Sequence, residues 1–187
     1  YGLHVGAWRP PARARLREIK SAREGRGFIL LIADPGQLDD WVAARPGVTC
    51  ALIEAAWPGP LTLVLPAREG VPEDLRVRGS LALRCPASPL LRATLHRLPG
   101  PLLSTSANRS GEPPPARYEQ VAPEIREACD LRVDGGQLCG EGSTILRPEP
   151  DGSLRLLRAG LWDPGPWRRL IRPRADEGGA HRRRPAN

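Results

Sequence analysis

The chain has 187 residues, enough for one domain with its own hydrophobic core. Apolar residues make up 40% of the chain, above the range of disordered proteins, and no long apolar run predicts a membrane-spanning helix. The four cysteines form no C-x-x-C pair and none lies near a histidine at metal-ligand spacing. These features exclude a typical zinc site and favour reduced thiols in a cytoplasmic protein.

The net charge of +7 is unevenly distributed along the chain. Residues 161–187 hold seven arginines against Asp163, Asp176 and Glu177, and the end of this segment is rich in Gly and Pro. We therefore expect a folded domain at 1–160, followed by a basic, disordered tail at 161–187. The tail is compatible either with contact to RNA or with a role in solubility.

The first hundred residues show helical and strand patterns in irregular alternation. Gly25 and Gly27 end a basic helix, and the continuous apolar run that follows is typical of a strand buried on both faces. The predicted elements are helix 10–24, strand 28–33, a turn and helix at 34–45, helix 50–56, strand 61–65, strand 80–86 and helix 89–98.

The second half continues with shorter elements. We predict strand 101–104, helix 118–129, strand 131–134 stopped by two glycines, and two late strands at 144–146 and 154–158 flanking a turn. This order indicates an α/β (α+β) domain with a twisted mixed β-sheet and flanking helices.

The segment Ser104-Thr105-Ser106-Ala107-Asn108-Arg109-Ser110-Gly111 follows the strand at 101–104. Small hydroxyl and amide side chains at the end of a strand let backbone N–H groups and side-chain donors converge on phosphate oxygens. On composition alone, a solvated serine-rich turn is the favoured explanation of the segment.

A second hydroxyl-rich segment, 140–145, contains two glycines, Ser143 and Thr144, and lacks the lysine of a Walker A loop. Arg84 and Arg158 each lie on a predicted strand, where an arginine is either an edge residue or an anion binder. Taken together, these features predict a phosphate- or nucleotide-binding site.

Lys20, Arg23 and Arg26 lie near the end of the first helix, as a solvated basic face or a polyphosphate cradle. The sequence shows no G-x-S-x-G and no HExxH motif. The polar residues therefore suit the positioning of a charged substrate better than covalent catalysis, and we assign no catalytic nucleophile.

Six motifs resemble, in order and spacing, those of the YrdC/TsaC family, in its single-domain threonylcarbamoyl-AMP synthase form. They are PGPLTLVLPA (58–67), LALRCPASP (81–89), PLLSTSANRSGEPP (101–114), VDGG (133–136), GSTIL (142–146) and LLRAG (156–160). The resemblance covers 1–160. It implies a YrdC-like fold that forms threonylcarbamoyl-adenylate from ATP with Mg²⁺, L-threonine and bicarbonate, for the t6A modification of tRNA at position 37.

The resemblance also implies roles for individual residues. Ammonium and guanidinium groups at Lys20 and Arg84 would position substrate and stabilise charge. The implied ATP-binding residues are Lys20, Arg23, Ser80, Ser104, Ser106, Asn108, Ser143 and Arg158, and the implied threonine-binding residues are Tyr1, Thr62, Arg84 and Ser143. Arg23 and Arg26 are both candidates for the family's second basic residue.

Tyr1-Gly2-Leu3 resembles the end of the family's Pro-Thr-Asp-Thr-x-Tyr-Gly-Leu strand. The resemblance therefore implies that the domain lacks its first strand and helix, and that the chain as given is inactive or poorly folded, whereas its complete parent is active. Other expected partners are tRNA or double-stranded RNA and the downstream threonylcarbamoyl-transferase proteins. Two alternatives are a non-catalytic RNA-binding YrdC-like module and a carbamoyl-adenylate-handling domain of hydrogenase maturation.

Overall fold

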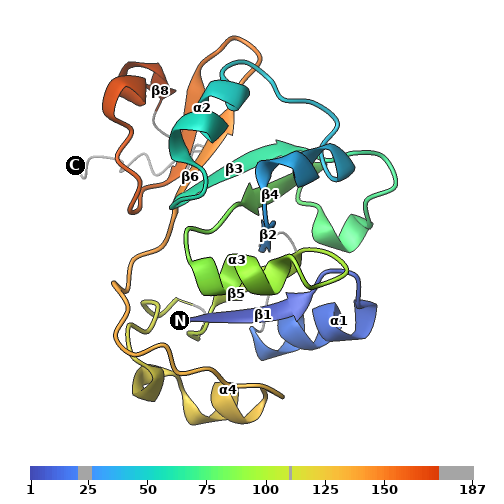
Figure 1. The fold of residues 1–187 in the computed structure, drawn as a ribbon, viewed down its shortest axis with the longest axis vertical. Helices are drawn as coiled ribbons and strands as arrows, with labels where there is room; N and C mark the ends of the chain where they lie inside the picture. The colour runs from blue at the N-terminus through green and yellow to red at the C-terminus, as the bar shows by residue number, and fades with distance from the viewer. Residues whose placement is uncertain (21–26, 110, 173–187) are drawn as a thin grey trace, which may run out of the picture.

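A computed structural model describes residues 1–20, 27–109 and 111–172 as one eight-stranded mixed sheet with helices around it (Figure 1). The strands lie in the order β1-β5-β2-β4-β3-β6-β7-β8. Their bounds are Gly2–Gly6 (β1), Ile29–Leu31 (β2), Leu61–Pro66 (β3), Ser80–Arg84 (β4), Leu102–Ser106 (β5), Thr144–Pro148 (β6), Leu154–Arg158 (β7) and Ile171–Arg172 (β8).

The α-helices are short, and three of them begin with proline at the first turn. They are α1 (Pro10–Ile19), α2 (Thr49–Ala56), α3 (Pro89–Leu95) and α4 (Pro123–Glu127); the 3₁₀ turns are Pro35–Asp40 (η1), Glu73–Leu75 (η2), Tyr118–Gln120 (η3) and Gly165–Leu170 (η4). Within the described ranges, no helix has the length and apolar character needed to cross a lipid bilayer.

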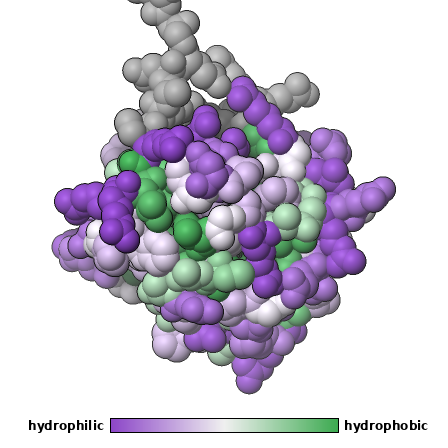
Figure 2. Space-filling view, turned by 90° about the horizontal axis from the view of Figure 1, so that it is seen from above, coloured by the Kyte–Doolittle hydropathy of each residue, from purple (hydrophilic) through white to green (hydrophobic). Residues whose placement is uncertain are grey.

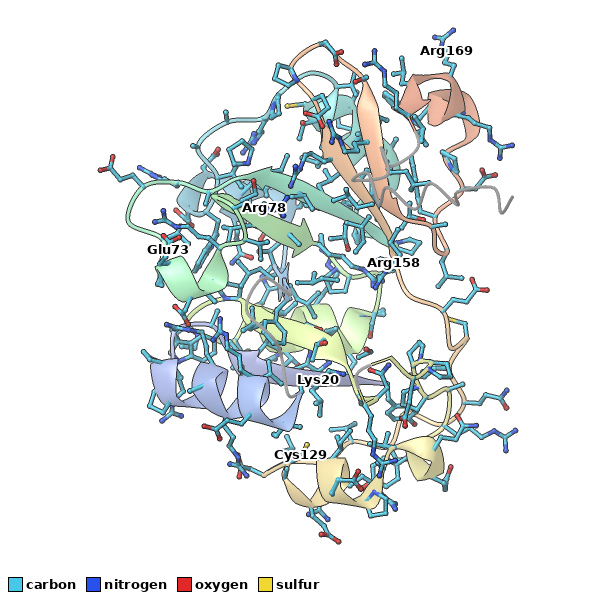
Figure 3. All side chains as sticks on the ribbon, turned by 180° about the vertical axis from the view of Figure 1, so that it is seen from behind. Lys20, Glu73, Arg78, Cys129, Arg158 and Arg169 are labelled. Atoms are coloured by element: carbon cyan, nitrogen blue, oxygen red, sulfur yellow. The ribbon has the colours of Figure 1, made fainter. Side chains whose placement is uncertain are left out.

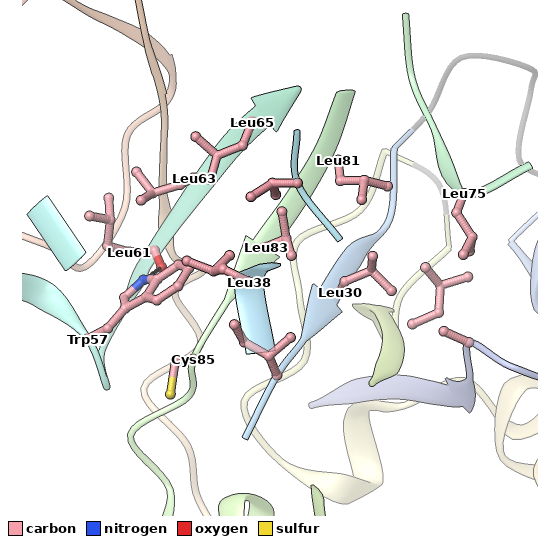
Figure 4. Close-up of a cluster of buried hydrophobic side chains, with 14 of the residues drawn as sticks. Leu30, Leu38, Trp57, Leu61, Leu63, Leu65, Leu75, Leu81, Leu83 and Cys85 are labelled. Carbon is pink, nitrogen blue, oxygen red and sulfur yellow. Dashed lines mark hydrogen bonds between the residues drawn. The ribbon is translucent and has the colours of Figure 1, made fainter. Parts of the chain in front are cut away.

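The two faces of the sheet differ because side chains alternate along each strand. In β4, Leu81 and Leu83 are 1% and 0% exposed, whereas the side chains between and beside them are half-buried. Leucines of β3, β5 and β6 share the face of Leu81 and pack with Leu16 of α1, Leu38 of η1 and Leu52 of α2 (Figure 4). We call this the core face.

The opposite face carries the other set of alternating residues, and we call it the open face. Leu91 and Leu95 of α3 cover one part of it by packing against Leu31 and Leu102. The rest is not filled by a second leucine layer, because Ser80, Ala82 and Arg84 take the corresponding positions of β4.

The mixed sheet, the flanking helices and most predicted elements are confirmed. The predicted helix 118–129 is broken into η3 and α4, because Ala122 precedes Pro123 and takes an extended conformation (φ −54°, ψ 138°). The predicted helix at 34–45 is the shorter 3₁₀ turn η1, and the strand expected at 101–104 continues to Ser106. Helix 10–24 is confirmed through Ile19, and its last residues lie outside the described ranges.

Two predictions are wrong. Residues 131–134 form no strand, since no neighbouring strand pairs with them. Residues 161–172 are not disordered: Trp162, Trp167 and Ile171 pack against the core, and β8 pairs with β7. The tryptophans and aliphatic residues of this segment provide apolar side chains that pack against the core. The prediction overlooked them because it rested on the high arginine content. Residues 173–187 of the predicted tail lie outside the described ranges.

A partly buried ion pair ties α1 to η2, before β4. The guanidinium of Arg13, whose side chain is 7% exposed, donates to both carboxylate oxygens of Asp74 at 2.7 and 2.9 Å and to the carbonyl of Ala7. Hydrogen bonding from Arg13 lowers the pKa of the Asp74 carboxyl, and Arg17 adds to this effect. The Asp74 carboxylate therefore compensates the charge of the Arg13 guanidinium, which is largely removed from water.

We expect Asp74→Ala to lower the free energy of unfolding by about 2 kcal/mol, because it leaves the Arg13 guanidinium buried without its carboxylate. The half-exposed position of Asp74 keeps the loss at the lower end of the range for buried pairs. Urea denaturation measures it, with Asp130→Ala, which removes the exposed partner of Arg15, as a matched control expected to have little effect. Since the folded-state pKa of Asp74 is depressed, the difference between wild type and Asp74→Ala should be present above the carboxyl's ordinary pKa and shrink as pH falls through the lower folded-state value. Equal losses in both variants would contradict this role of the pair.

Candidate functional site

The site residues that the sequence places on strands share the open face of the sheet. Pairing registers set Ser104 opposite Ile29, Ile29 opposite Ala82, and Ala82 opposite Val64. Residues directly opposite one another point to the same face, and so do residues two apart on one strand. By this relation Ser80, Arg84, Thr62, Ser104 and Ser106 lie on the open face. Arg158 pairs with Ile145, the partner of Thr62, beside a register shift between Ile145 and Leu146, and so lies on the same face as Thr62.

A first cluster lies where β3, β6 and β7 meet. The hydroxyls of Thr62 and Ser143 are 2.7 Å apart, and both residues are buried. Arg158 donates from Nε and Nη2 to the Ser143 carbonyl at 3.1 and 2.9 Å, and from Nη2 to the Ser143 hydroxyl at 3.2 Å. The backbone and hydroxyl of Ser143 therefore fix the plane of this guanidinium.

Two glycines allow residues 142–143 to lie very close to residues 158–160. A Cβ on Gly142 would lie 2.8 Å from Nη2 of Arg158, and one on Gly160 would lie 2.4 Å from the carbonyl oxygen of Gly142. Both distances are shorter than side-chain contacts permit, so residues 142–143 and 158–160 pack backbone to backbone. The sequence signal for these positions is a glycine in each of GEGS and RAG: Gly142 is predicted only as part of a hydroxyl-rich loop, and Gly160 only as part of a family motif.

Arg84 ends β4 in the same region and donates from Nε to the carbonyl of Gly59 at 2.9 Å. Burial lowers the pKa of the Arg84 guanidinium, and the positive charge of Arg158 lowers it further. Burial also lowers the pKa of Arg158. In the described part of the chain, neither arginine forms an ion pair with a carboxylate.

Two mutually repelling cations, Arg84 half-buried and Arg158 exposed at the end of β7, have no acidic partner among the described residues and form a region that favours an anion. Carbonyl oxygens orient both guanidiniums and use only part of their five donors. The remaining N–H donors of each guanidinium can therefore form two parallel hydrogen bonds with one carboxylate or phosphate.

A second cluster lies at the end of β5. The Lys20 ammonium donates to the Ser106 carbonyl at 2.9 Å, to the Asn108 side-chain oxygen at 2.8 Å and to the Asn108 carbonyl. The Ser106 hydroxyl donates to the same side-chain oxygen, and the Asn108 amide nitrogen donates to the carbonyl of Glu112. One lysine thus holds the STSAN segment in place from the end of α1, as Figure 3 indicates by the position of Lys20.

The two clusters are separate subsites. Four strand-to-strand steps lead from β5 to β6, which at about 4.8 Å per step amounts to roughly 19 Å. Figure 3 shows Lys20 at the end of α1 and Arg158 at the end of β7, toward opposite ends of this region. An elongated ligand with anionic groups, rather than a compact one, fits such an arrangement.

The remaining predicted residues have different positions. Ser80 and Ser104 lie on the open face, and their hydroxyls make no hydrogen bond to a described residue. The Tyr1 hydroxyl donates to Asp134 at 2.7 Å and accepts from the backbone N–H of Gly135, so the structure does not bring it to the cluster with Thr62. Arg23 and Arg26 lie outside the described ranges.

The sequence did not point to His4. It lies on the open face opposite Ser104, with an exposed side chain. The alternation in Gly-Leu-His-Val-Gly contains the signal, but we had expected a strand only through Leu3. Among the described residues, no group of three or more His, Cys, Asp or Glu gathers into a metal-binding cluster. Polar side chains cover much of the molecular surface, with apolar patches between them (Figure 2).

Comparison with known proteins gives consistent matches. A curated threonylcarbamoyl-AMP synthase from Nitrosococcus oceani is 38% identical over 136 residues, covering 72% of this chain and 74% of the relative. One from Bacillus subtilis is 34% identical over 164 residues, covering 86% of this chain and 47% of that protein. The crystal structure of P. abyssi Sua5 complexed with L-threonine has a TM-score of 0.83 and 31% identity, over 92% of this chain and 52% of that chain.

The chain thus spans about half the length of the Bacillus and P. abyssi proteins. The family model described as "Telomere recombination", for Sua5, YciO and YrdC proteins, matches residues 1–160. This range includes both clusters and every strand from β1 to β7. The chain therefore belongs to the Sua5/YciO/YrdC family.

Proposed function

We propose that this chain is a threonylcarbamoyl-AMP synthase, which forms L-threonylcarbamoyladenylate and pyrophosphate from L-threonine, bicarbonate and ATP. The observation that carries the proposal is the pair Arg84 and Arg158: two cations on one open face, the first half-buried and the second exposed, both oriented by carbonyl oxygens and without a described carboxylate partner. Relatives in the family carry the same activity in their names.

In the proposed reaction, the threonine amine attacks the carbon of bicarbonate, and a carbamate forms as water is lost. A carbamate oxygen then attacks the α-phosphorus of ATP, and the bond to the β-phosphate oxygen breaks as pyrophosphate leaves. Each bonding change occurs between substrates, so a protein nucleophile is unnecessary. Catalysis then consists of positioning the two reactants and stabilising charge on phosphate oxygens.

The first cluster suits the threonine end of this reaction. Arg84 would bind the threonine carboxylate, and the Thr62 and Ser143 hydroxyls would contact its polar groups. The hydrogen bond between these hydroxyls fixes their orientation before substrate arrives.

The second cluster and the strand serines suit the nucleotide. Ser104, Ser106 and Asn108 would bind ATP near its α-phosphate, Ser80 would line the same face, and Ser143 with Arg158 would contact the adenylate. Lys20, which already holds Ser106 and Asn108, would bring positive charge to the phosphates, together with Arg23. Mg²⁺ enters in this proposal as part of the substrate, bound by ATP, and supplies charge neutralisation on the phosphates.

The product would supply the t6A modification of tRNA at position 37 through downstream transferase proteins. The proposal is tested by incubating the protein with Mg·ATP, bicarbonate and labelled threonine. We expect pyrophosphate release that depends on both threonine and bicarbonate. ATP-independent RNA binding with steep salt dependence, and no such release, would favour the RNA-binding alternative.

The nucleotide end is tested by Ser106→Ala and Asn108→Ala. Each removes a hydrogen-bonding group of the second cluster, and we expect ATP affinity to fall about tenfold, as for the loss of one charged hydrogen bond. Calorimetric titration with ATP measures the change. Thr105→Val is the matched control, because Thr105 directly precedes Ser106 on β5 and points to the core face. An equal loss in Thr105→Val would show that the open face is not where ATP binds.

The threonine end is tested by Arg84→Ala. Because this change removes the proposed partner of the threonine carboxylate, we expect the KM for threonine to rise about tenfold or more, with a much smaller change in ATP affinity. Arg97→Ala is the control, since its exposed guanidinium donates to a backbone carbonyl of α3 away from the sheet. If Arg84→Ala lowered only thermal stability, Arg84 would be a structural residue.

A further inference from the structure

Residues 160–162 pass around the start of β6, next to the first cluster. They follow β7 and precede η4 and β8, which lie at one end of the sheet (Figure 1). The family model ends at residue 160, so Leu161 and Trp162 lie beyond the matched range. Hydrogen bonds nevertheless join these two residues to the positions on either side of Ser143.

The hydroxyl of Thr144 makes two hydrogen bonds to the backbone of Trp162. It donates to the Trp162 carbonyl at 3.1 Å and accepts from the Trp162 N–H at 3.1 Å. On the other side of Ser143, the Leu161 N–H donates to the Gly142 carbonyl at 3.0 Å. Thr144 is 3% exposed, so water does not compete for its hydroxyl.

These contacts hold the start of β6 from both faces of the sheet. Thr144 pairs with Leu61 and lies on the core face, whereas Arg158 binds the carbonyl and hydroxyl of Ser143 from the open face. Between the two contacts lies Gly160, where a Cβ would be 2.6 Å from the Ser143 carbonyl oxygen. The backbone of Ser143 therefore has little freedom to shift relative to Arg158.

The segment that holds Thr144 is itself fixed to the core. The side chains of Trp162 and Trp167 pack against it, and β8 pairs in parallel with β7, with Ile171 opposite Leu154. Among the described residues, the Trp162 N–H and carbonyl have no hydrogen-bond partner besides the Thr144 hydroxyl. Loss of that hydroxyl would leave both groups without a partner.

We propose that Thr144 and Trp162 are positioning residues for the first cluster: the Thr144 hydroxyl, held by the Trp162 backbone, keeps Ser143 where its carbonyl and hydroxyl orient Arg158. The inference rests on the proposed function for the identity of the ligand, since Ser143 and Arg158 would contact the adenylate. Thr144 faces the core and touches no substrate, so its effect on binding passes through Ser143.

A role of the Thr144 hydroxyl in stability alone has a different consequence, which Thr49 allows us to separate. Thr49 is 0% exposed, and its hydroxyl donates to the carbonyl of Pro46. It lies toward the other end of β6, because a Cβ on Gly47 would be 2.8 Å from the carbonyl oxygen of Glu149. Thr→Val removes a buried hydroxyl at either position, but only Thr144 adjoins the cluster.

The first measurement is the affinity for Mg·ATP by calorimetric titration, at a temperature at which each variant is folded. We expect Thr144→Val to weaken binding about fivefold, because Ser143 and Arg158 lose their fixed arrangement. Thr144→Ser keeps the hydroxyl and should bind as the wild type does. Thr49→Val should also bind as the wild type does, although it lowers thermal stability. Equal weakening in Thr49→Val or in Thr144→Ser would overturn the proposal.

The second measurement needs no ligand and separates this inference from the proposed function. In ¹⁵N NMR spectra, the Nε–H of Arg158, identified by its loss in Arg158→Lys, should exchange slowly with water because it donates to the Ser143 carbonyl at 3.1 Å. We expect exchange about fivefold faster in Thr144→Val and unchanged in Thr49→Val. If the wild type binds no ATP but shows this difference, the proposed function fails and the positioning role stands. Equal exchange in Thr144→Val and the wild type would overturn the positioning role.

Discussion

Alternation of side chains along the strands is the constraint on which the rest of the structure depends. A strand directs successive residues to opposite faces, so a leucine layer on one face leaves every second position free for polar residues. In β4 the sequence Ser-Leu-Ala-Leu-Arg buries Leu81 and Leu83 and directs Ser80 and Arg84 to the open face. The same division extends through β3 and β5. The core therefore positions the site, because each buried leucine fixes the direction of its polar neighbour.

The open face differs from the core face in carrying two positive charges, those of Arg84 and Arg158. A buried guanidinium usually has a carboxylate beside it, as Arg13 has Asp74. Arg84 and Arg158 instead have carbonyl oxygens, from Gly59 and Ser143, which orient them and leave their charge uncompensated. In the proposed function, the free energy cost of holding two such cations near each other would be recovered when an anion binds between them. The Arg13 and Asp74 pair stabilises the fold, whereas we propose that Arg84 and Arg158 form a binding site.

The sequence predicted most of the fold, and it failed where the outcome depended on distant partners. Strand β4 was predictable from local alternation alone, and so was its arginine. Residues 131–134 have an equally good strand pattern, but a strand requires a pairing neighbour that local sequence cannot reveal. The order of residues 161–172 was missed because charge dominates the composition, while Trp162 and Trp167 supply the packing. In the site, motifs identified Ser143 and Arg158, but not the close backbone crossing at Gly142 and Gly160 that brings them together.

The central claim is that both clusters face one elongated ligand site on the open face of the sheet. The most direct measurement is a crystal structure of the protein with a non-hydrolysable ATP analogue and L-threonine. The account predicts the phosphates near Lys20, Ser106 and Asn108, and the threonine carboxylate within hydrogen-bond distance of Arg84. A nucleotide bound on the core-face side of the sheet, or at a surface where it contacts neither Arg84 nor Arg158, would contradict this account.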